Sequence, residues 1–128
     1  MRRNITIKTL LLLSLFVTGS AWAEWIKIDS MEVSILYIDP ATIRKEGSLR
    51  KVWTLFNLKQ RATDGTMSIR SRQEFDCKDE KYRFLTMTKY TGPMTEGKMI
   101  SNGENPSDWF EIPPDTSAES FLKIVCAQ

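Results

Sequence analysis

The sequence contains no histidine, and its only cysteines are Cys77 and Cys126. Histidine is the usual general base near neutral pH and a frequent metal ligand. Its absence disfavours a cysteine nucleophile, which needs a neighbouring base, and a cysteine-ligated metal site, which needs co-ligands. The sequence also lacks a glycine-rich phosphate loop and a nucleophile elbow. We therefore expect no cofactor, no metal and no enzymatic activity.

A long apolar run occurs only once, near the start of the chain. The basic segment MRRNITIK precedes the apolar segment TLLLLSLFVTGS, and AWA places small residues where signal peptidase cuts. This pattern predicts a secretory signal peptide at residues 1–23, cleaved between Ala23 and Glu24. The run falls short of the roughly 20 residues that span a bilayer. Arg2 and Arg3 raise the twin-arginine export route, but the residues that flank such a pair are missing, which favours ordinary secretion.

The expected mature chain, residues 24–128, should form one domain. It contains no second apolar run of spanning length, and no cysteine follows the cleavage site to form a lipobox. We expect a soluble protein that is periplasmic or secreted.

The positive charge of the full sequence belongs to its first segment. Removing residues 1–23 takes away Arg2, Arg3 and Lys8, leaving 15 basic and 16 acidic residues and a net charge of −1. Nucleic-acid binding requires a concentrated basic patch, so this balance argues against a nucleic-acid partner.

Export exposes the two thiols to an oxidising compartment, which predicts a Cys77–Cys126 disulfide. Such a bond would stabilise the fold by up to about 4 kcal/mol in the chain-entropy model. The alternatives are a free nucleophile and a metal ligand, both disfavoured by the lack of histidine.

Short segments with alternating side chains predict an antiparallel sheet. EWIKID and VSILYIDP are expected strands, the second ending at Asp39-Pro40, and further strands should flank a turn at Glu46-Gly47. Asp64-Gly65 predicts a hairpin turn with positive φ at both residues. Loops are expected around Gly92-Pro93, Gly97 and SNGENPSD, followed by a short strand in WFEI.

The segment TMSIRSRQEFDC predicts a strand with one buried and one solvated face, followed by a returning strand in KYRFLTMTKYT. The residues expected on the buried face are Met67, Ile69, Ser71, Gln73 and Phe75. The residues expected on the solvated face are Ser68, Arg70, Arg72, Glu74 and Asp76.

The C-terminal segment PPDTSAESFLKIVCAQ predicts a helix. Thr116 and Glu119 have the spacing of a capping box, in which each side chain accepts from a free backbone amide. The side chains expected on one apolar stripe are Ala118, Phe121, Leu122, Val125 and Cys126. A helix of about ten residues is marginal alone, so the disulfide should clamp it to the sheet.

Several motifs occur in an order that resembles the surface-adhesin protein E-like family of Gram-negative bacteria. They are YIDPATI, KVWTLFNL, EFDC, YRFL, an isolated Trp109 and PPDTSAESFLKIVC. The resemblance implies an α+β fold with about six antiparallel strands and a C-terminal helix that a disulfide joins to the sheet. It also implies an adhesin that binds host extracellular-matrix or envelope proteins and can form a homodimer.

A basic strip is the candidate protein-contact site. Arg70 and Arg72 share one strand face, and Lys81 and Arg83 should lie beside them on the returning strand. The strip could bind an acidic partner, or it could pair with its acidic neighbours Glu74, Asp76, Asp79 and Glu80, as charges across a solvated sheet commonly do.

Two other groups of residues have the chemistry of a site but not its usual arrangement. Glu74 and Asp76 are spaced about 7 Å apart along a strand, as in some glycosidases, but a solvated face would not raise a catalytic pKa. Met87, Met94 and Met99 are soft copper ligands without the tight repeats of such sites.

Three tryptophans, Trp25, Trp53 and Trp109, are either packing residues or, if they gather on one exposed face, a contact surface. A binding protein is thus the favoured hypothesis, and the alternatives are a structural subunit of an envelope assembly and a carboxylate-based hydrolase.

Overall fold

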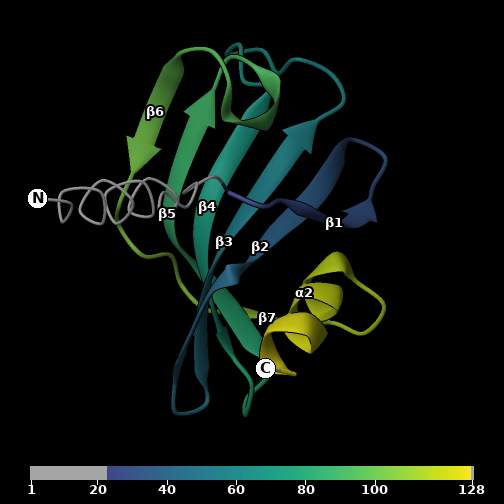
Figure 1. Ribbon diagram of the computed structural model, residues 1–128, viewed down its shortest axis with the longest axis vertical. Helices are drawn as coiled ribbons and strands as arrows, with labels where there is room; N and C mark the ends of the chain where they lie inside the picture. Colours follow the sequence, from purple (N-terminus) through teal and green to yellow (C-terminus); the bar gives the residue numbers. More distant parts are fainter. Residues whose placement is uncertain (1–22, 128) are drawn as a thin grey trace, which may run out of the picture.

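The computed structural model describes residues 23–127, so residues 1–22 of the predicted signal peptide lie outside the described part. Six antiparallel strands form one sheet in the order of the chain, β1-β2-β3-β4-β5-β6 (Figure 1). Their bounds are β1 Ile26–Ser30, β2 Ser34–Glu46, β3 Leu49–Leu58, β4 Ser68–Asp76, β5 Lys81–Tyr90 and β6 Met99–Gly103. A two-residue strand, β7 (Phe110–Glu111), also pairs with β5, and the chain ends in α2 (Ser117–Cys126). The predicted α+β fold is confirmed.

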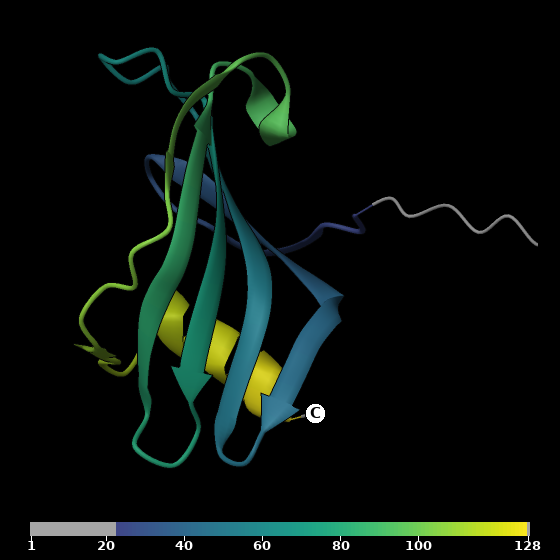
Figure 2. The ribbon, with the colours of Figure 1, turned by 90° about the vertical axis from the view of Figure 1, so that its left-hand side faces the viewer.

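The helix α2 covers one face of the sheet, and within residues 23–127 no α-helix covers the other face. Figure 2 shows α2 crossing diagonally behind the strands. Buried apolar side chains from β2, β3, β4 and α2 meet in this layer, namely Leu36, Ile38, Val52, Phe75, Phe121, Leu122 and Val125. We call this side of the sheet the helix face. Because side chains alternate along a strand, Trp53, Arg70 and Arg72 lie on the opposite side.

The strand β2 is longer than predicted. The expected end at Asp39-Pro40 is wrong, because the strand continues to Glu46 after an irregular segment between Asp39 and Arg44. Thr42 holds this bulge together, since its hydroxyl donates to the Asp39 carbonyl at 2.7 Å and accepts from the Trp53 backbone amide at 3.0 Å. A bulge of this kind tolerates proline, which has no amide hydrogen for the ladder.

Two other local predictions need correction. The hairpin at Asp64-Gly65 joins β3 to β4, but only Gly65 has positive φ (92°), so the turn is not of the predicted type. The first three residues of the predicted loop SNGENPSD, Ser101–Gly103, belong to β6, which pairs with β5. All five residues of β6 are exposed, so the sequence around it lacks the apolar alternation that marks a half-buried strand.

The C-terminal helix begins as predicted. The Thr116 hydroxyl accepts from the Glu119 amide at 3.3 Å, and the Glu119 carboxylate accepts from the Asp115 amide at 3.4 Å. The second bond reaches one residue further back than in the expected capping box. None of the helices within residues 23–127 combines the length and apolar character needed to cross a bilayer.

The disulfide between Cys77 and Cys126 is present, with a Cα–Cα distance of 5.8 Å. Cys77 directly follows β4, and its backbone amide donates to the Ser48 carbonyl at 2.9 Å. Cys126 is the last residue of α2. The bond therefore joins the end of the helix to the end of a central strand that is itself fixed by the sheet.

Aromatic rings extend the core across the helix face. Tyr82 stacks on Phe75 with ring centroids 6.0 Å apart and meets Phe84 edge-on at 5.7 Å. Phe121 of α2 lies 6.4 Å from Phe75. Burial in this cluster raises the pKa of the Tyr82 hydroxyl above its usual value, because the phenolate would lose hydration.

Removal of the disulfide should destabilise the protein while leaving the sheet formed. The two cysteines are separated by 49 residues, for which the chain-entropy model gives about 4 kcal/mol. We expect Cys77→Ser with Cys126→Ser to lower the free energy of unfolding by about 2–4 kcal/mol in urea titrations. Reductant should produce the same loss in the wild type and no change in the double variant. Equal stability of the two proteins without reductant would contradict this account.

The stability of the fold should also depend on Tyr82 at alkaline pH. The folded-state pKa lies above the unfolded-state value of about 10, so the folded state holds the proton more tightly. The resulting contribution of Tyr82 to the free energy of unfolding is complete below the unfolded-state pKa. It is lost as pH rises through the folded-state pKa. We expect the thermal midpoint of the wild type to fall more steeply than that of Tyr82→Phe as the pH rises above about 10. Parallel curves over this range would show that Tyr82 is not responsible.

Candidate protein-binding face

The register of β4 and β5 brings the predicted basic strip together. Glu74 lies opposite Arg83 and Asp76 lies opposite Lys81, so these residues share a face with Arg70 and Arg72. An extra residue in β5 shifts the register between Arg72 and Gln73. The four basic residues form two groups, Arg70 with Arg72 and Lys81 with Arg83.

Trp53 lies next to the first group. It is directly opposite Arg72 in the β3–β4 ladder, and the guanidinium carbon of Arg70 lies 4.7 Å from the centre of its ring. This distance is that of a cation–π contact, in which the charge faces the electron-rich surface of the ring. The indole therefore orients Arg70 without neutralising it.

Trp109 lies next to the second group. The Arg83 guanidinium carbon and the Lys81 Nζ atom lie 4.5 Å and 5.3 Å from the centre of its ring. Ser107 anchors this loop to β5, because its amide donates to the Phe84 carbonyl at 2.8 Å and its hydroxyl accepts from the Phe84 amide at 3.0 Å. Trp109, which is distant in sequence from Lys81 and Arg83, is thereby held over their side chains.

Trp25 completes the set at the start of the described chain. It lines a cavity of about 320 Å³ together with Trp53, Arg70 and the β2 bulge at Ala41 and Thr42. The Nε atom of Arg70 is buried and has no hydrogen-bond partner within residues 23–127. We call the side formed by Trp25, Trp53, Trp109, Arg70, Arg72, Lys81 and Arg83 the arginine–tryptophan face.

The carboxylates on this face have structural partners. Glu74 is only 3% exposed, which corrects the expectation of a fully solvated face, and its Oε1 atom lies 2.7 Å from Nη2 and 2.8 Å from Nε of Arg83. The Oδ1 atom of Asp76 accepts from the amides of Lys78 and Asp79, both at 3.0 Å, and so closes the turn before β5. These bonds occupy the carboxylates of both Glu74 and Asp76. The two carboxylates are therefore not arranged as a general acid and a nucleophile.

The remaining basic residues keep their charge available. Among the described residues, ion pairs involve Arg83, Lys89 and Lys123 as the basic partners, and none involves Arg70, Arg72 or Lys81. The prediction of pairing is thus correct for Arg83 alone. Arg70, Arg72 and Lys81 present positive charge beside half-buried indole rings.

Comparison with known proteins identifies the family. The family model described as surface-adhesin protein E matches residues 25–127. The chain belongs to the surface-adhesin protein E family. The match takes in both cysteines and all three tryptophans of the arginine–tryptophan face.

Solved structures of protein E from Haemophilus influenzae have the same fold. Crystal form II is 15% identical with a TM-score of 0.61, and the match covers 86% of this chain and 97% of that one. Protein E from a non-typeable strain is 16% identical with a TM-score of 0.63, over 86% of this chain and 80% of the other. No curated protein sequence matches significantly. At these identities the likeness extends to the fold only.

The methionines do not form an evident site in this member of the protein E family. Met87 belongs to β5, Met94 to the short 3-10 helix η2 (Pro93–Thr95) and Met99 to β6. Within residues 23–127 there is also no cluster of three or more Cys, Asp or Glu side chains arranged to hold a metal.

Sequence reasoning missed the partners of the basic strip. The alternation of β4 placed Arg70 and Arg72 together, but the positions of Trp53 and Trp109 depend on strand register and on a loop anchored by Ser107. The one available signal was the position of Trp109 directly after the polar segment SNGENPSD, since a tryptophan at the end of a polar loop requires a packing partner or a ligand.

Proposed function

We propose that the protein is an exported, non-enzymatic binding protein that contacts an acidic surface of another protein through its arginine–tryptophan face. The observation that carries this proposal is that three tryptophans gather on the face that α2 leaves uncovered, with Arg70, Arg72 and Lys81, none of which forms an ion pair within residues 23–127. Arginine and tryptophan are the residues most enriched at the energetic centres of protein interfaces. Membership of a surface-adhesin family supports the same conclusion.

The rigidity of the face supports binding rather than mere solvation of charge. Trp53 fixes Arg70, and Trp109 fixes Lys81 and Arg83, so these long side chains have already lost part of their rotational freedom. Binding of a partner then costs less side-chain conformational entropy. A partner carboxylate near Arg70 and Arg72 would supply the ion pair that the described residues do not provide. The partner class is a host extracellular-matrix protein or a protein of the cell envelope.

A second candidate is a structural subunit of an envelope assembly or a homodimer formed through a sheet edge. The specific observation is β6, an edge strand in which Met99 is 62% exposed and Ile100 is 36% exposed. Exposed edge strands can pair with another chain through their free backbone groups. The two candidates use different surfaces, so substitutions on one need not affect the other.

We also propose that export removes residues 1–23 and gives a periplasmic or secreted chain that begins at Glu24. The Glu24 backbone nitrogen lies 3.3 Å from Oδ2 of Asp39, and Asp39 is only 6% exposed. Cleavage would turn this nitrogen into a positively charged α-ammonium group. A buried carboxylate with no charged partner within the described residues would then acquire one.

Loss of charge at Arg70 and Arg72 should weaken partner binding. We expect Arg70→Gln with Arg72→Gln to reduce the affinity for the bound protein at least tenfold, about 1.4 kcal/mol, and to lessen its salt dependence. The measurement is biolayer interferometry of the mature chain against a panel of purified extracellular-matrix proteins and solubilised envelope proteins. Lys45→Gln with Lys98→Gln is the matched control, because both lysines are exposed and lie outside the face. Equal weakening by the two double variants would reject a specific role for this face.

The proposed new N-terminus should stabilise the mature fold. A charge-assisted contact with a buried group contributes about 1–3 kcal/mol, so retaining Ala23 or substituting Asp39→Asn should lower the free energy of unfolding by that amount. The two changes together should have little more effect than either alone, because both remove the same interaction. Urea titrations of the four proteins test this coupling, and mass spectrometry of the exported protein tests the cleavage site. Additive effects, or a chain beginning elsewhere, would contradict the proposal.

A further inference from the structure

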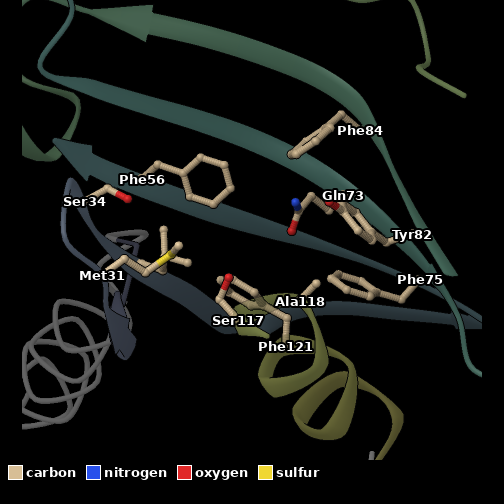
Figure 3. Close-up of a pocket in the computed structure, with 11 residues that line it drawn as sticks. Met31, Ser34, Phe56, Gln73, Phe75, Tyr82, Phe84, Ser117, Ala118 and Phe121 are labelled. Carbon is tan, nitrogen blue, oxygen red and sulfur yellow. The ribbon is translucent and has the colours of Figure 1, made fainter. Parts of the chain in front are cut away.

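A second cavity, of about 220 Å³, lies on the helix face, where the first turn of α2 meets the sheet (Figure 3). Its walls come from β2, β3, β4 and β5, from Ser117 and Ala118 of α2, and from Met31 in the turn between β1 and β2. It is separated from the arginine–tryptophan face by the thickness of the sheet. The two sites can therefore be tested independently.

Gln73 projects into the centre of this group of side chains (Figure 3). The residue is only 3% exposed, and its Oε1 atom has no hydrogen-bond partner within residues 23–127. Buried polar groups are almost always hydrogen-bonded, so an unpartnered amide oxygen at a cavity wall indicates a missing donor. The terminal torsion of glutamine is soft, so rotation about it can direct this oxygen into the cavity.

Aromatic rings surround the Gln73 amide. Phe56 and Phe84 meet edge to face at 6.2 Å, and Tyr82 meets Phe84 in the same way at 5.7 Å. Phe75 and Phe121 lie below them, toward the helix. A flat ring gains favourable edge and face contacts in such surroundings.

The lining excludes a charged ligand. None of the side chains that line the cavity is acidic or basic, and an ion placed there would lose its hydration without a compensating charge. The volume limits the ligand further, since an apolar cavity of roughly 150 Å³ accommodates benzene. A cavity of about 220 Å³ has room for one further small ring or a short substituent.

We propose that this cavity binds a small neutral aromatic compound whose single N–H or O–H group donates to Oε1 of Gln73. Indole and substituted phenols are the chemical class that satisfies these requirements. Met31 stands at the mouth and is 42% exposed. Its flexible thioether can fold over a bound ring, as methionine does at adaptable apolar sites.

Indole and benzothiophene make a matched pair of probes, because they share size and shape but only indole has an N–H donor. Amide chemical shifts of ¹⁵N-labelled mature protein should be followed during titration with each compound. We expect dissociation constants of roughly 0.01–1 mM for indole, as ligand size allows, with shifts at Gln73, Phe75 and Ala118. Benzothiophene should bind about five- to tenfold more weakly. In Gln73→Met, the two compounds should bind equally.

Substitution at the mouth provides a second, independent variant. Ala118→Leu places side-chain atoms in the cavity and should abolish the shifts, whereas Ser120→Leu adds the same side chain to α2 at a residue outside the lining. Thermal melts would establish that each variant is folded. Absence of saturable indole shifts up to about 2 mM in folded wild-type protein would overturn the proposal. Equal binding of indole and benzothiophene to the wild type, or shifts confined to Trp25, Trp53 and Trp109, would overturn it as well.

Discussion

The covalent link between Cys77 and Cys126 is the constraint on which the packing of α2 against the sheet depends. A ten-residue helix gains too little from its own hydrogen bonds to persist in water, and the aromatic side chains of β4 and β5 need a cover. The disulfide holds Phe121, Leu122 and Val125 over Phe75, so that helix and sheet bury each other's apolar surface. The loop that the bond closes adds to the stability that the limited core of a small domain provides.

Covering one face of the sheet gives the two faces different chemistry. On the helix face, buried rings surround a neutral cavity with one unpartnered amide. On the opposite face, tryptophans hold guanidinium and ammonium groups at cation–π distance without neutralising them. The first arrangement suits a small uncharged molecule, whereas the second suits an acidic protein surface. Both depend on the same alternation of side chains along β4, where Gln73 and Arg72 are neighbours in sequence and point to opposite sides.

Irregular backbone segments shape both sites. The β2 bulge between Asp39 and Arg44 forms one wall of the cavity beside Trp25, and Thr42 ties it to the backbone of Trp53. The extra residue in β5 opposite the step from Arg72 to Gln73 sets which β5 side chains face the helix. Arg83 is thereby placed beside Glu74, and Phe84 beside Gln73. Bulges redirect side chains in this way because one additional residue reverses the alternation on one strand only.

The sequence by itself determined the features that depend on local chemistry or on the number of cysteines. Two cysteines in a chain with a predicted export signal predicted the disulfide, Thr116 and Glu119 predicted the start of the helix, and alternation placed Arg70 and Arg72 on one face. Tertiary structure alone decided the strand register, the β2 bulge, the exposed strand β6 and the positions of Trp53 and Trp109. It also decided that Glu74 is buried against Arg83 and that Oε1 of Gln73 has no hydrogen-bond partner in the part of the chain that the structure describes. These features arise from contacts between residues distant in the chain. Local sequence patterns do not predict the energies of such contacts.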